Sequence, residues 1–193
     1  MKKLSFVALV GFVAAITTVR GDIIPSFAGT SPGPNTSTVW NYVIDITSNQ
    51  QVTTGDFFTI YDFGPFISGS NMQPTDWSFS SALVTPPPSG TTPPDNPTLE
   101  NLTWTYTGTA TIPTGTHLGN FSVTIPTSQF EEVPQTRNTY FAAQATRTDT
   151  PAGTKINNVG QVPAPVPIPE PTTLSLLALA GIGSAFRAIR RRK

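Results

Sequence analysis

Apolar and polar residues alternate with a period of two in the middle of the chain. Between residues 40 and 46, tryptophan, tyrosine and two isoleucines occupy the even positions and the odd positions are mixed, which is the pattern of a half-buried β-strand. Seven segments carry this pattern or part of it: Trp40–Ile46, Phe57–Phe63, Trp77–Val84, Leu102–Thr107, Phe121–Ile125, Tyr140–Arg147 and Ile156–Val162. With no convincing helical period between them, they predict an all-β domain over residues 22–162, an antiparallel immunoglobulin-like β-sandwich of about seven strands. A barrel is the alternative.

The core of this domain must form by packing alone, because the chain contains no cysteine and therefore no disulfide or thiolate metal site. A domain of about 150 residues buries roughly two thirds of the surface that its unfolded chain exposes, which is enough for one core. The three tryptophans, Trp40, Trp77 and Trp104, fall on strand segments, so we expect them in the core. A carbohydrate-stacking role would require one of them to be exposed.

Prolines mark two segments outside the expected strands. Six prolines lie between Pro86 and Pro97, and each removes a donor from a sheet ladder. We therefore predict a long, exposed connection over residues 85–98, and favour a solvated spacer over a binding loop. Further along, prolines recur at every second residue from Pro163, which predicts an extended, semi-rigid Pro-rich linker over residues 163–168.

The first 21 residues have the parts of a secretory signal peptide. Lys2 and Lys3 form a positive n-region, residues 4–16 form an apolar h-region, and a cleavage site with tolerated residues lies between Gly21 and Asp22. We therefore predict that residues 1–21 are a signal peptide and that the chain is exported. An uncleaved anchor is the alternative, because the site lacks the usual pair of alanines.

An apolar segment and a basic tail lie at the other end. Residues 174–186 are apolar but number only 13, about 20 Å as a helix against a hydrocarbon core of about 30 Å. Such a short hydrophobic helix suits a temporary membrane anchor. The basic residues that would stop transfer and stay in the cytoplasm are Arg187, Arg190, Arg191, Arg192 and Lys193.

The formal net charge of zero conceals a segregation of charge along the chain. Residues 22–169 hold ten acidic and three basic residues, a net charge of −7, and the other eight basic residues lie toward the two ends. Nucleic-acid binding needs clustered positive charge on the folded domain. The charge pattern therefore excludes nucleic acid as an expected partner.

A short motif joins the predicted linker to the apolar segment. Pro169, Glu170 and Pro171 precede the apolar helix and the basic tail, and residues 169–193 in this order resemble the PEP-CTERM protein-sorting signal of Gram-negative bacteria that make extracellular polysaccharide. The resemblance implies that an exosortase, a membrane transpeptidase-like enzyme, recognises the motif, cuts near it and passes the protein to the exterior. Three stretches of the β-domain are also similar to small PEP-CTERM proteins, residues 102–108, 118–121 and 158–160, and the family attaches no known activity to them.

The order of motif, apolar segment and basic tail is shared with sortase signals of Gram-positive type. Those signals need a Leu-Pro-x-Thr-Gly motif, which the chain lacks. An ordinary tail anchor, in which the prolines are incidental, is the remaining alternative.

Few residues could carry chemistry. His117 lies in a turn-like stretch without a Gly-x-Ser-x-Gly elbow, and we expect it in a surface loop. Glu131 and Glu132 are adjacent and would face opposite sides of a strand, which does not suit a glycosidase pair. Asp56 and Asp62 bracket an aromatic strand but lack an Asp-rich calcium loop, so we expect solvated acids. We predict no catalytic residue, cofactor or metal site.

The sequence therefore favours an exported, non-enzymatic surface or extracellular-matrix protein that an exosortase sorts, associated with exopolysaccharide or biofilm. Such a protein is expected to be anchored transiently in the inner membrane and then to reach the cell surface or the exterior. A secreted carbohydrate-active enzyme that uses scattered aspartates and a simple tail-anchored surface protein are the alternatives.

Overall fold

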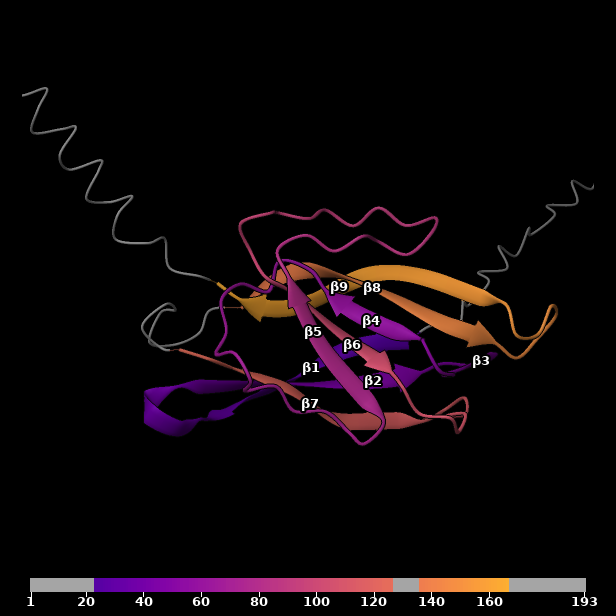
Figure 1. Ribbon diagram of the computed structural model, residues 1–193, viewed down its shortest axis with the longest axis horizontal. Coiled ribbons are helices and arrows are strands. Elements are labelled where there is room, and N and C mark those ends of the chain that lie inside the picture. The colour runs from indigo at the N-terminus through magenta and orange to yellow at the C-terminus, as the bar shows by residue number, and fades with distance from the viewer. Residues whose placement is uncertain (1–22, 127–135, 167–193) are drawn as a thin grey trace, which may run out of the picture.

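The computed structural model describes residues 23–126 and 136–166 (Figure 1). Their strands are β1 (Ile23–Pro32), β2 (Thr38–Ile46), β3 (Gln50–Gln51), β4 (Phe57–Ile60), β5 (Trp77–Ala82), β6 (Asn101–Tyr106), β7 (His117–Ile125), β8 (Thr136–Arg147) and β9 (Lys155–Pro165), and a 3-10 turn, η1 (Pro34–Thr36), joins β1 to β2. The predicted signal peptide, its cleavage site and the sorting signal lie outside the described residues.

The strands pair antiparallel into two sheets. The smaller sheet has the order β1-β2-β7, and the larger has the order β3-β8-β4-β6-β5 with β9 also paired to β8. Residues 141–144 of β8 pair with both β4 and β9, so β9 lies on the opposite side of β8 from β4. The prediction of an all-β fold is confirmed, and the strands form two separate sheets rather than the barrel alternative.

Each of the seven predicted segments contains a strand, but two strands were missed. β1 escapes the period-two pattern because its alternation is broken by a register shift between Phe27 and Gly29, and only Ile23 and Pro25 of its ten residues are buried. β3 is two residues long, too short for any pattern. Three strands also end before the predicted segments do: β4 ends at Ile60, β5 at Ala82 and β6 at Tyr106.

An aromatic core fills the space between the sheets. Trp40 and Trp104 are fully buried and Trp77 is 6% exposed, which confirms the prediction that all three tryptophans are core residues. The Trp104 ring stacks on Phe58 at 5.1 Å between centroids, and Trp77 meets Phe121 edge-on at 5.0 Å. Aromatic pairs at this spacing add about 0.5–1.5 kcal/mol each beyond their burial.

The predicted linker begins too early. Pro163 and Pro165 belong to β9, where they lie opposite Asn138 and Thr136 of β8. Alternate residues of a strand direct their N–H groups to opposite edges, so prolines spaced by two remove donors from one edge only and leave the ladder to β8 intact. The carbonyl of Pro163 instead accepts a hydrogen bond from the Tyr42 hydroxyl at 2.9 Å. The folded domain therefore extends to Pro165, three residues beyond its predicted end.

The long connection between β5 and β6 is confirmed as irregular, but it is not a free spacer. Asp95 accepts hydrogen bonds from the Thr85 amide at 3.1 Å and from Asn101 Nδ2 at 2.9 Å. The Ser89 carbonyl accepts one from Asn157 Nδ2 of β9 at 2.8 Å. The connection thus folds back along the larger sheet, as Figure 1 shows above β8 and β9.

Candidate functional site

The outer face of the larger sheet is built from alternate residues of five strands. Register places one residue of each strand in a row across the sheet: Asn157 of β9, Gln144 of β8, Phe57 of β4, Thr105 of β6 and Ser78 of β5. We call this row the uncharged strip. Four spacings of about 4.8 Å between neighbouring strands make the strip roughly 19 Å long.

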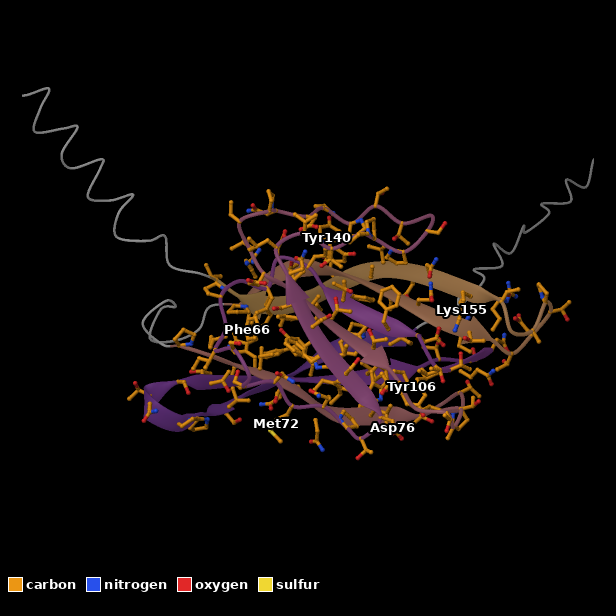
Figure 2. All side chains as sticks on the ribbon, viewed as in Figure 1. Phe66, Met72, Asp76, Tyr106, Tyr140 and Lys155 are labelled. Atoms are coloured by element: carbon orange, nitrogen blue, oxygen red, sulfur yellow. The ribbon has the colours of Figure 1, made fainter. Side chains whose placement is uncertain are left out.

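The strip faces solvent, and the next row is covered at its centre but exposed at its ends, Ser80 and Val159. Ser78 is exposed, and the other four strip residues are half-buried. In the next row, the outward-facing Thr59 and Ala142 are fully buried. The β5–β6 connection contacts the strip at its β9 end, where the Ser89 carbonyl accepts a hydrogen bond from Asn157. Tyr140 lies beneath this connection and Lys155 near the far end of the β8–β9 pair (Figure 2).

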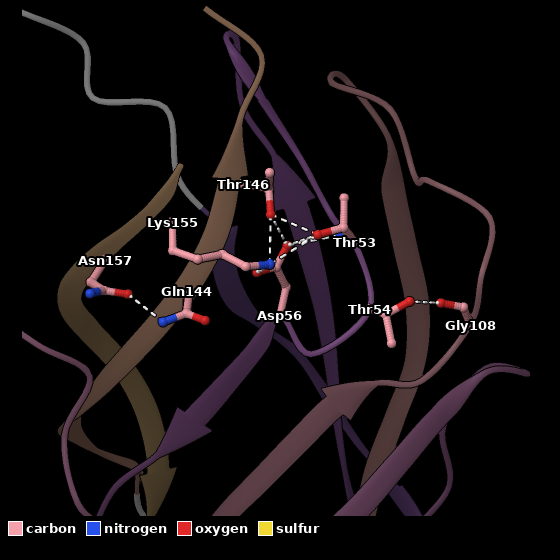
Figure 3. A network of polar contacts seen from close by, with 8 residues as sticks. All are labelled: Thr53, Thr54, Asp56, Gly108, Gln144, Thr146, Lys155 and Asn157. Carbon is pink, nitrogen blue, oxygen red and sulfur yellow. Dashed lines mark hydrogen bonds and ion pairs between the residues drawn. The ribbon is translucent and has the colours of Figure 1, made fainter. Parts of the chain in front are cut away.

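Hydrogen bonds hold the polar side chains of the strip in fixed positions. Gln144 Nε2 donates to Asn157 Oδ1 at 3.1 Å (Figure 3), and Asn157 Nδ2 in turn donates to the Ser89 carbonyl. At the opposite end, Ser78 Oγ donates to the Thr105 carbonyl at 3.3 Å. Within the described residues, Gln144 Oε1 accepts no hydrogen bond, so it remains available to a ligand.

An ion pair between a buried carboxylate and a partly exposed lysine lies beside the strip. Asp56, just before β4, is fully buried, and its Oδ1 accepts a hydrogen bond from Lys155 Nζ at 2.7 Å. Its Oδ2 accepts hydrogen bonds from the Thr53 amide at 2.8 Å and from Thr146 Oγ1 at 2.7 Å. Figure 3 shows these groups converging on the carboxylate. Both oxygens are therefore occupied by donors, as a buried carboxylate requires.

The expectation that Asp56 and Asp62 are solvated acids is wrong for Asp56. Its burial depends on Lys155, which lies 99 residues further along the chain and could not be assigned to it from spacing. Asp62 accepts a hydrogen bond from the Asn96 amide at 2.7 Å and so fixes the β5–β6 connection. Within residues 23–126 and 136–166, no group of three or more potential metal ligands comes together.

His117 lies at the first residue of β7 rather than in a loop. The expectation was wrong because β7 extends four residues N-terminal to the predicted strand, and His117 pairs there with Asp45 of β2. The ring Nδ1 is 2.6 Å from Asp45 Oδ1, and both side chains are at least half exposed. In the described part of the chain, no serine or threonine hydroxyl is hydrogen-bonded to this ring.

Two further groups have pKa values that reflect their burial. Burial, together with the negative charge of Asp95, raises the pKa of Tyr61 to about 12. The Tyr61 hydroxyl is buried without a hydrogen-bond partner. Burial lowers the pKa of Arg137, whose guanidinium donates to the carbonyls of Pro165 and Asp62. Arg137 thereby ties the last residue of β9 to the chain that follows β4.

The sequence did not predict the uncharged strip, although the pattern of β6 indicated one part of it. Thr103 and Thr105 are the polar half of the alternation in β6, so an outward hydroxyl-bearing face could be inferred there. The contributions of Gln144 and Asn157 depend on the register of β8 and β9, which the alternation does not specify.

Comparison with known proteins concerns the segment that follows the described domain. Residues 167–193 match the PEP-CTERM protein-sorting motif, so this part of the chain carries that motif. The match begins directly after Val166, the last described residue. The motif implies an exported protein that an exosortase sorts at the membrane. A comparison with curated proteins finds no match.

The predicted sorting residues Pro169, Glu170 and Pro171 fall within this match. They lie outside the described residues, as do the basic tail, the signal cleavage site and the pair Glu131 and Glu132. The part of the chain that the structure describes contains no helix long and apolar enough to span a membrane.

Proposed function

We propose that this chain is a non-enzymatic protein of the cell surface or extracellular matrix, which an exosortase processes at Pro169, Glu170 and Pro171. The main support for the proposal is that the PEP-CTERM motif follows closely after β9, the last strand of the β-domain. The protein is transiently anchored in the inner membrane and then associates with exopolysaccharide outside the cell. An immunoglobulin-like class of the sandwich belongs to the same proposal and is supported by two antiparallel sheets around one aromatic core. An experimental structure that does not superpose on immunoglobulin-like domains would remove that class.

The sorting step is tested by expressing the full chain in a bacterium that contains an exosortase and in the same strain without it. Mass spectrometry of the exported protein should find no peptide from residues 174–193 when the exosortase is present, and those peptides should persist when it is absent. The variant Glu170→Ala should behave like the strain without the enzyme. Pro163→Ala changes a nearby proline in β9, outside the matched residues 167–193, and serves as the matched control. Identical processing in both strains would favour a simple tail anchor.

The non-enzymatic role is tested separately with the purified chain. A hydrolysis screen over a panel of polysaccharides should detect no turnover. Turnover that is abolished by single Asp→Asn changes would instead establish the carbohydrate-active enzyme that remains the second hypothesis.

A further inference from the structure

We propose that the uncharged strip is a binding site for a neutral polysaccharide chain, laid across β9, β8, β4, β6 and β5. Such a site would be the surface through which the protein associates with exopolysaccharide, so the proposal rests on the proposed function. Three properties of the strip support this proposal: it carries no charge, it has amides, hydroxyls and an aromatic ring, and it is long enough for a polymer.

The strip carries no charge. None of its five residues is charged, and neither is any residue of the row on its Ser80 side, Ser80, Thr103, Thr59, Ala142 and Val159. Of the charges that flank the strip, Lys155 and Asp56 neutralise each other, and Asp76 is exposed two residues before Ser78. A charged ligand would therefore lose hydration on the strip without gaining an opposite charge, which is unfavourable. An acidic polymer would in addition be repelled by the net charge of −7 over residues 22–169.

The groups on the strip match the chemistry of a sugar chain. Gln144 and Asn157 supply amides, and Ser78 and Thr105 supply hydroxyls, so both donors and acceptors of hydrogen bonds are present. The half-buried Phe57 lies in the middle of the row, and its ring offers an apolar surface to the C–H face of a pyranose. Sugars present hydroxyls at their edges and C–H groups on their faces, which is the combination that this row can satisfy.

The amides of the strip are preorganised for binding. The chain of hydrogen bonds from Gln144 through Asn157 to the Ser89 carbonyl fixes both side chains before a ligand arrives. Side chains that are already ordered lose less conformational entropy on binding. The row of about 19 Å suits an extended polymer better than a single small molecule.

Other occupants fit the strip less well. Residues 127–135 of the same chain include Glu131 and Glu132, whose carboxylates would be desolvated there without a cationic partner. A second copy of the chain would bring the same net negative charge against the first. A neutral polysaccharide meets neither penalty.

The test is affinity electrophoresis of the full chain, purified in a non-ionic detergent, through native gels that contain dextran, mannan, galactomannan, xyloglucan or the acidic polymer alginate. At least one neutral polysaccharide should retard the protein and alginate should not. The double variant Gln144→Ala/Asn157→Ala should weaken that retardation about tenfold, because it removes two amide contacts. Asn41→Ala is the matched control: Asn41 is also an asparagine with a cross-strand hydrogen bond, but it lies on β2 of the other sheet, and its loss should leave retardation unchanged.

A second variant protects the test against misfolding. Ser78→Ala/Thr105→Ala removes two hydroxyls at the other end of the strip and should weaken binding several-fold while circular dichroism stays that of the parent chain. Retardation by none of the neutral polymers, or retardation that survives in both folded double variants, would overturn the proposal. Either result leaves the exosortase experiment untouched, because processing at the sorting motif is measured independently of glycan binding.

Discussion

Replacing Lys155 by methionine should destabilise the domain by about 2–3 kcal/mol. Breaking a buried ion pair by removing one partner costs about 3–5 kcal/mol, because it leaves an uncompensated buried charge. Here the carboxylate of Asp56 is fully buried, but the Lys155 side chain is 39% exposed. Water can therefore reach the site of the missing ammonium, and the hydrogen bonds from Thr53 and Thr146 remain. Both effects place the expected cost at or below the lower end of that range.

Urea unfolding followed by the fluorescence of the three buried tryptophans measures this cost. The matched control is Arg147→Met: Arg147 also pairs with an aspartate, Asp149, at 2.6 Å, but this aspartate is 40% exposed rather than buried, so loss of the pair should lower the unfolding midpoint far less than Lys155→Met does. A double-mutant cycle with Asp56→Asn should give a coupling free energy of at least about 1 kcal/mol. If Lys155→Met shifts the midpoint no more than Arg147→Met does, and the coupling is near zero, the pair does not stabilise the fold.

Three further predictions concern single positions. Tyr61→Phe should raise the free energy of unfolding by about 1–2 kcal/mol, because it removes a buried hydroxyl that has no partner, and urea titration measures the gain. Gly160→Ala should cost about 1–3 kcal/mol in the same assay, since its Cβ would lie 2.5 Å from the ring of Phe141, the cross-strand partner of Gly160. The Arg147 guanidinium lowers the pKa of Asp149, so the stability that this carboxylate adds is present above its unfolded pKa and is lost as pH falls through its lower folded pKa. Asp149→Asn should therefore make the urea midpoint fall less steeply than in the parent between about pH 5 and pH 2.

The alternation of apolar and polar residues was sufficient to predict which side chains of a single regular strand are buried. In β2, the even positions from Trp40 to Ile46 are buried, as the period of two requires. β1 was missed because its shift between Phe27 and Gly29 interrupts that period, and its partner strand rather than its own pattern holds it in place.

Contacts between distant strands could not be predicted in the same way. The burial of Asp56 requires Lys155, and the uncharged strip requires five strands in one particular register. A shift of one residue in β8 would turn Gln144 inward and expose the opposite face. Both features depend on which strands pair and in which register. The composition of the chain and the spacing of its residues do not determine that pairing.

The sorting motif lies closer to the folded domain than the sequence predicted, because β9 continues to Pro165. The sequence predicted a rod of alternating prolines from Pro163, but pairing with β8 continues through Pro165, and Arg137 donates a hydrogen bond to the carbonyl of that last residue at 3.1 Å. Only four residue steps then separate the sheet from Pro169. A fully extended chain covers at most about 3.6 Å per residue, so the motif can lie no more than roughly 14 Å from the end of β9 while that strand stays paired. An exosortase that acts on the folded protein must therefore work close against the β-domain, unless the last residues of β9 separate from β8 first.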